Sequence, residues 1–232
     1  MKSVGAAIAL IAFAATSHFS EGQEKSATTP AASTAGQPTG PVAPPKVARG
    51  DQWSYDYTDE STGDPSATMT YTVTELTDKD TTVKVSKLGG PMIGAIFVFD
   101  ANWNLKQDNV WKNFPDDGLG FSLPLSVGKE WSSSGSNKNT LNGGVFKHQG
   151  KSKVVEQAKV TTPAGSFETF KIVSDMKWVP ANGAGSKSEI HAETWFAPDI
   201  NRIVKRTYVA KYSGHVFSQY TMELTDNSPT SN

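Results

Sequence analysis

The chain contains no cysteine. Disulfide bonds and thiol chemistry are therefore excluded, and so is the lipidated cysteine that tethers a bacterial lipoprotein. The formal net charge is only −1 over 232 residues, which argues against a basic surface for nucleic acid. Beyond the N-terminal region, no apolar run is long enough to cross a bilayer. We therefore expect no nucleic-acid partner and no transmembrane segment after removal of a signal peptide.

The short motifs of common active sites are also missing. The four histidines show none of the close spacings typical of zinc ligands, so we expect no metal site. No G-x-S-x-G nucleophile motif and no glycine-rich phosphate loop before a helix occurs. We expect no catalytic residue and no cofactor. Carboxylates on facing strands are the remaining route to a hydrolase.

Residues 1–17 have the pattern of a secretory signal peptide. Lys2 supplies the positive charge at the start. The apolar stretch over residues 4–15 is shorter than the roughly 20 residues that span a bilayer. We therefore expect an exported protein, periplasmic or extracellular, that is soluble and not a lipoprotein.

The rest of the chain divides by composition. Residues 18–49 are rich in Pro, Ala, Ser and Thr and hold few large apolar side chains, which predicts a flexible linker. Residues 50–226 carry the aromatic and β-branched residues and are expected to form a single β-domain. Residues 227–232 are polar and predict a disordered tail.

Apolar and polar residues alternate along much of this domain. The alternation is clearest over residues 52–57, 69–74 and 219–224, and it is typical of strands with one buried face. Turn-forming residues separate the runs, and no stretch shows a helical apolar stripe. The sequence therefore predicts an all-β fold: about ten strands in a curved antiparallel sheet, forming a sandwich or a partly closed β-barrel.

The two halves of the domain begin alike, with GDQW at residues 50–53 and GKEW at residues 128–131. Two similar β-meanders packed into one core would explain this likeness. Unrelated antiparallel meanders also resemble one another, so both interpretations stay open.

The stretch TTPAGSF at residues 161–167 predicts a tight hairpin. Pro163 presets φ for the turn, and Gly165 can adopt a positive φ. Phe167 then begins the return strand. We expect a structural corner of the sheet here.

This hairpin is part of a wider pattern, carried by Thr162, Pro163, Ala164, Gly165, Phe167, Trp195, Ala197, Pro198 and Lys205. The order TPAG-x-F, then W-F-AP, then V-K resembles the DUF3108-like exported bacterial β-proteins, whose function is unknown. The resemblance implies a curved, barrel-like envelope protein from a Gram-negative bacterium. It implies no catalytic residue.

The aromatic residues Trp103, Trp111, Phe114 and Phe121 occupy a long and mostly irregular connection. Such a connection either plugs the end of a barrel or lines the mouth of a ligand site. We take these four as candidate ligand-binding residues. An alternative in which the tryptophans lie flat and exposed would suit a sugar.

The expected function is a noncatalytic envelope protein that binds an apolar small molecule, a lipid or another envelope component. The alternatives are a structural or assembly factor with a protein partner, and a hydrolase acting on cell-envelope material. A deep cavity beneath Trp103 and Trp111 would favour ligand binding. A filled interior with an exposed apolar patch would favour a protein partner, and converging carboxylates would favour an enzyme.

Overall fold

Twelve antiparallel strands close into one barrel in the computed structural model, which describes residues 47–63, 65–88 and 94–229. The predicted signal peptide and residues 18–46 of the linker predicted over residues 18–49 lie outside the described residues. The strands are β1 (Gln52–Asp59), β2 (Pro65–Leu76), β3 (Asp80–Lys87), β4 (Ala95–Asp100), β5 (Leu105–Gln107), β6 (Trp111–Phe114), β7 (Glu130–Asn139), β8 (Val145–Thr162), β9 (Gly165–Pro180), β10 (Ser188–Ala197), β11 (Arg202–Tyr212) and β12 (His215–Ser228).

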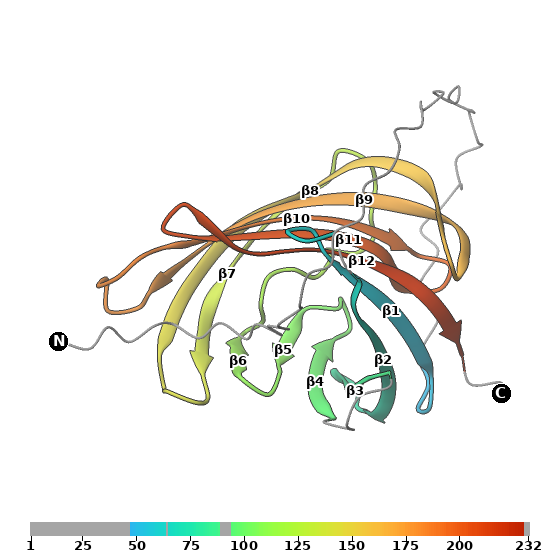
Figure 1. Ribbon diagram of the computed structural model, residues 1–232, viewed down its shortest axis with the longest axis horizontal. Helices are drawn as coiled ribbons and strands as arrows, with labels where there is room; N and C mark the ends of the chain where they lie inside the picture. Colours follow the sequence, from blue (N-terminus) through green and yellow to red (C-terminus); the bar gives the residue numbers. More distant parts are fainter. Residues whose placement is uncertain (1–46, 64, 89–93, 230–232) are drawn as a thin grey trace.

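Each strand pairs with the next along the chain, and β1 pairs with β12 to close the sheet. The all-β prediction is confirmed, and the open choice between sandwich and barrel is settled as a closed barrel. The strands differ in length around the barrel: Figure 1 shows the long strands β8–β12 arching over the shorter strands β3–β6. No helix in the part of the chain that the structure describes is long and apolar enough to cross a membrane.

Side chains alternate between the barrel interior and its outer face, as the sequence pattern predicts. On β1, Trp53 and Tyr55 are buried while Gln52 is exposed. On β9, Ile172 and Met176 are buried between exposed or half-buried neighbours. This alternation removes large apolar surfaces from water, which is the main favourable contribution to folding.

The connection between β6 and β7 turns into the barrel, and we call residues 115–123 the plug segment. Phe121 is buried, and its ring centroid lies 4.4 Å from that of Phe196 on β10. Gly118 has a φ of 75°, and a Cβ there would lie 2.5 Å from the Ser133 Oγ and 2.9 Å from the Met176 Cε. Only glycine suits both this conformation and this close approach. The plug segment fills one part of the interior and leaves the rest as a cavity.

Candidate functional site

A partly enclosed cavity of about 310 Å³ lies inside the barrel, between the plug segment and the wall. Most of its wall is aromatic, with contributions from β1, β2, β4, β6, β11 and β12. The apolar lining includes Phe97, Phe99, Trp103, Trp111, Leu119 and Phe217. Its volume is at the lower end of the ~300–1,000 Å³ typical of small-molecule sites.

Trp103 and Trp111 are held on the cavity wall by ring contacts. Trp103 lies edge-on to Trp53, with ring centroids 5.7 Å apart, and its Nε1 donates a 2.9 Å hydrogen bond to the Oδ1 of Asn201. Trp111 is buried and lies edge-on to Trp178, at 5.8 Å. These contacts hold both indole rings in one orientation on the cavity wall.

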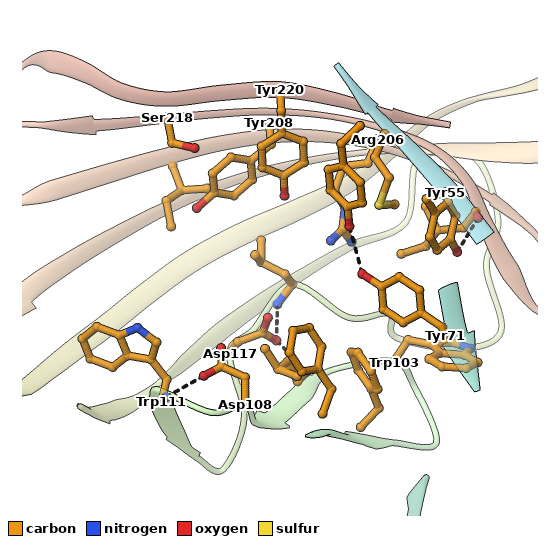
Figure 2. Close-up of a pocket in the computed structure, with 18 of the residues that line it drawn as sticks. Tyr55, Tyr71, Trp103, Asp108, Trp111, Asp117, Arg206, Tyr208, Ser218 and Tyr220 are labelled. Atoms are coloured by element: carbon orange, nitrogen blue, oxygen red, sulfur yellow. Dashed lines mark hydrogen bonds between the residues drawn. The ribbon is translucent and has the colours of Figure 1, made fainter. Parts of the chain in front are cut away.

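Arg206 on β11 brings a positive charge into this aromatic surrounding. Its Nε donates a 2.9 Å hydrogen bond to the Oγ1 of Thr194, the directly opposite residue on β10. Its positive charge lowers the pKa values of Asp117 and of the cavity tyrosines, opposing the larger upward effect of burial. Figure 2 shows its guanidinium pointing into the cavity.

Asp117, in the plug segment, faces Arg206 from the opposite side (Figure 2). Its Oδ1 accepts hydrogen bonds from the backbone N–H of Leu105 at 3.0 Å and of Leu119 at 3.1 Å. Protein atoms surround the carboxyl, although part of its surface is open to the cavity. Burial raises the pKa of Asp117 to about 7, against the opposing effect of these hydrogen bonds and of Arg206. The group therefore changes charge near neutral pH.

The hydroxyls of four of the cavity tyrosines add to the polar part of the wall. The hydroxyls of Tyr57 and Tyr71 are hydrogen-bonded at 2.9 Å. The rings of Tyr208 and Tyr220 are stacked 4.9 Å apart, and both hydroxyls point into the cavity (Figure 2). Burial raises the pKa of all four tyrosines, so the hydroxyls stay protonated and can donate hydrogen bonds.

A second arginine, Arg202, borders the cavity but is engaged by the protein. It forms an ion pair with Asp51 at 3.5 Å and lies over the Trp53 ring at 4.1 Å. Its Nη1 also donates to the Asn201 backbone carbonyl at 2.9 Å. Its Nε has no hydrogen-bond partner in the part of the chain that the structure describes, but Asp51 compensates its charge. Arg206, in contrast, has no ion-pair partner among the described residues.

The four aromatic residues singled out from the sequence occupy three different environments. Trp103 and Trp111 line the cavity. Phe121 packs inside the plug segment against Phe196, and Phe114 is 54% exposed on the other side of the barrel wall. Phe121 and Phe114 are not among the cavity-lining residues. The aromatic connection therefore provides both a plug and part of the cavity wall.

Sequence reasoning missed the polar residues of the cavity. Arg206 has the same strand parity as the fully buried Val204 and Ala210, so the alternation already placed a cation on the inner face. Asp117 lies in an irregular segment without periodicity. Only the fold brings it opposite Arg206.

The hairpin motif lies away from the cavity. Pro163 and Ala164 form the tip between β8 and β9, and Gly165 has a φ of 136°. The Ala164 N–H donates to the Leu224 carbonyl at 3.2 Å, which ties this tip to β12. Thr162 is buried and Phe167 packs on the adjacent core. The motif therefore fastens the β8–β9 hairpin over the sheet.

The later part of the motif lies on β10 and β11. The Nζ of Lys171 is 4.9 Å and that of Lys205 is 5.9 Å from the Trp195 ring centroid. Lys205 also pairs with Glu223 at 2.7 Å. Ala197 is buried, and Pro198 accepts a hydrogen bond from Asn201 in the following turn. These contacts stabilise neighbouring strands and give the motif a structural role.

Together, the fold and cavity define an up-and-down antiparallel barrel with an internal plug and a partly polar interior cavity. No protein-family model matches the chain, and no curated protein sequence matches it significantly. Among solved structures, the chain is similar to a candidate exported protein with a YmcC-like fold from Bacteroides fragilis, with a TM-score of 0.53 and 13% identity, covering 78% of this chain and 97% of that one. It is also similar to a candidate lipoprotein from Parabacteroides distasonis, with a TM-score of 0.51 and 13% identity, covering 78% and 96%. These likenesses support the fold.

Proposed function

We propose that this protein is a noncatalytic, exported binding module that holds a small, largely apolar molecule inside its barrel. The observation that carries this proposal is the cavity of about 310 Å³ beside Trp103 and Trp111. A filled interior would have favoured a scaffold for a protein partner. A preformed aromatic cavity with a few polar groups is the usual architecture of a small-molecule site.

Export is proposed from the signal-peptide pattern of residues 1–17. The names of the two similar structures, an exported protein and a lipoprotein, agree with a cell-envelope setting. The chain offers no cysteine for lipidation, so the proposed form carries no cysteine-linked lipid anchor.

The carboxylates in the cavity do not favour a hydrolase. Asp108 accepts hydrogen bonds at its Oδ1 from the backbone N–H groups of Val110 and Trp111, at 2.7 and 2.6 Å. Asp117 likewise caps two backbone N–H groups. Both side chains therefore have structural roles in turns, which accounts for their presence without catalysis.

Ligand binding can be tested with the neutral apolar fluorophore N-phenylnaphthylamine. We expect a saturable rise in fluorescence on titration with the wild-type protein. Ser218 lines the cavity, so Ser218→Trp should fill it and weaken binding about tenfold or more, equal to roughly 1.4 kcal/mol.

The control is Gln219→Trp, at the next position on β12 with the opposite strand parity. It should bind the fluorophore as the wild type does. Failure of the wild-type protein to bind would overturn the proposed function. Equal binding by the Ser218→Trp variant would show that the fluorophore lies elsewhere and would also contradict it.

A further inference from the structure

We infer that the cavity selects amphiphiles with one anionic head group, a carboxylate, which Arg206 binds while the apolar tail lies against Trp103 and Trp111. This inference rests on the proposed function and names its ligand class. It differs from general apolar binding because it requires a charge preference and an orientation.

The first support is the incomplete pairing of Arg206. Its one hydrogen bond among the described residues is from Nε to Thr194. Over the same part of the chain, no carboxylate lies within ion-pair distance of its guanidinium. Removing a cation from water is costly unless an anion compensates it. The remaining N–H groups form a planar fork, which matches the two oxygens of a carboxylate.

The second support is the ring of hydroxyl donors beside this guanidinium. Tyr208 and Tyr220 project their hydroxyls into the same part of the cavity as Arg206 (Figure 2). The charge of Arg206 acts on both phenols. Protonated phenols can donate hydrogen bonds to a carboxylate oxygen that the arginine does not satisfy. An anion entering here would therefore meet one cation and two neutral donors.

The charge balance favours one negative charge on the ligand. The charge of Arg202 is compensated by Asp51, whereas Arg206 has no ion-pair partner among the described residues. Asp117 lies opposite and carries a full negative charge only when it is ionised. A monoanion neutralises Arg206, whereas a dianion such as a phosphate monoester would leave one charge uncompensated. A cationic head group would be repelled.

The shape of the cavity favours a short tail. The volume of about 310 Å³ is small for a ligand site. The apolar part of the wall includes Phe97, Phe99 and Leu119 beside Trp103 and Trp111. Apolar surface of this kind stabilises the methylene groups of a ligand by removing them from water. A medium-chain carboxylic acid suits the site better than a two-chain lipid.

The test is displacement of N-phenylnaphthylamine from the full protein by decanoate, decanol, decyl phosphate and decyltrimethylammonium. For the wild type, we expect decanoate to bind about tenfold or more tightly than decanol, since hydrogen bonds to charged groups are the strong ones. Decyl phosphate should bind less tightly than decanoate, and the ammonium compound should bind most weakly. Tighter binding of decyl phosphate would overturn the assignment to a carboxylate.

Variants identify the residue responsible. Arg206→Met should lose the preference for decanoate over decanol, because the guanidinium is the group that distinguishes the charged head group from the neutral one. Lys211→Met removes the same charge from the exposed end of β11 and should keep the full preference. Arg206→Lys retains the charge without the fork, so a reduced preference is expected. This variant also serves if Arg206→Met fails to fold.

The outcomes separate the two proposals. If decanoate and decanol bind equally, or if Arg206→Met keeps the preference, the anion inference is wrong while the proposed ligand site stands. If neither the fluorophore nor any of the four amphiphiles binds, both proposals are wrong.

Discussion

The indole Nε1 of Trp103 lies 2.9 Å from the Oδ1 of Asn201, and both residues have positive φ angles, 60° and 53°. The hydrogen bond joins the turn after β4 to the turn before β11, on opposite parts of the barrel wall. A positive φ is unfavourable for tryptophan and is retained only where the surroundings hold it. The cavity wall at Trp103 is therefore a fixed surface.

Trp103→Phe should lower the free energy of unfolding by about 1–2 kcal/mol, because it removes this donor and part of a half-buried ring. Urea denaturation followed by circular dichroism measures the loss. Trp195→Phe, on the outer face between two lysines, is the control and should cost less. An equal loss in both variants would contradict the structural role of the Trp103–Asn201 hydrogen bond.

Gly118→Ala should destabilise the plug segment. The new methyl group would lie 2.5 Å from the Ser133 Oγ at a residue with a φ of 75°, and we expect a loss of roughly 2 kcal/mol or more. Gly143 provides a matched control, because it has a φ of 74° and its Cβ would meet nothing within 4 Å. Thermal unfolding compares them. If Gly143→Ala lowers the stability as much as Gly118→Ala does, the close packing of the plug segment does not contribute to the stability of the barrel.

The raised pKa of Asp117, about 7, makes stability depend on pH. The folded-state pKa lies above the unfolded value of roughly 3.9. The stabilising contribution of the protonated form is therefore complete below about pH 4 and is lost as the pH rises through about 7.

Asp117→Asn should remove this dependence, since the amide keeps a carbonyl acceptor but cannot ionise. At pH 8.5 we expect the variant to be more stable than the wild type by about 2–4 kcal/mol, because one pKa unit corresponds to ~1.4 kcal/mol. Urea unfolding at several pH values measures the difference, with the exposed Glu168→Gln as control. If the variant is less stable than the wild type at pH 8.5, the ionised Asp117 carboxylate does not destabilise the folded protein, and the prediction is wrong.

Decanoate binding should weaken as the pH rises from about 6 to 8, because Asp117 then becomes negative opposite Arg206. The other ionisable groups that act on Asp117 or feel its charge are Asp116, Tyr208 and Tyr220. We expect a threefold to tenfold change, since a charge interaction in a protein interior is on the order of 1 kcal/mol. Fluorophore displacement across this range measures it. In Asp117→Asn the affinity should stay constant, and a persistent pH dependence there would assign it to another group.

Much of the barrel could be predicted from alternation, because strands such as β1 and β12 show one buried face directly in their residues. The closure of the barrel could not be predicted in this way, since it depends on pairing Gln52 with Ser228, two residues at opposite ends of the domain sequence. The tryptophans of the cavity could be found as aromatics in an irregular connection. Asp117 could not be identified as a cavity residue from the sequence, because it lies opposite Arg206 only when the plug segment turns into the barrel.

The crystal structure of the protein with decanoate tests the central claim most directly. We expect the carboxylate within about 2.7–3.2 Å of the Arg206 guanidinium nitrogens, with the alkyl chain between Trp103 and Trp111 inside the barrel. Decanoate bound only to the outer surface, or inside with its carboxylate directed away from Arg206, would contradict the account.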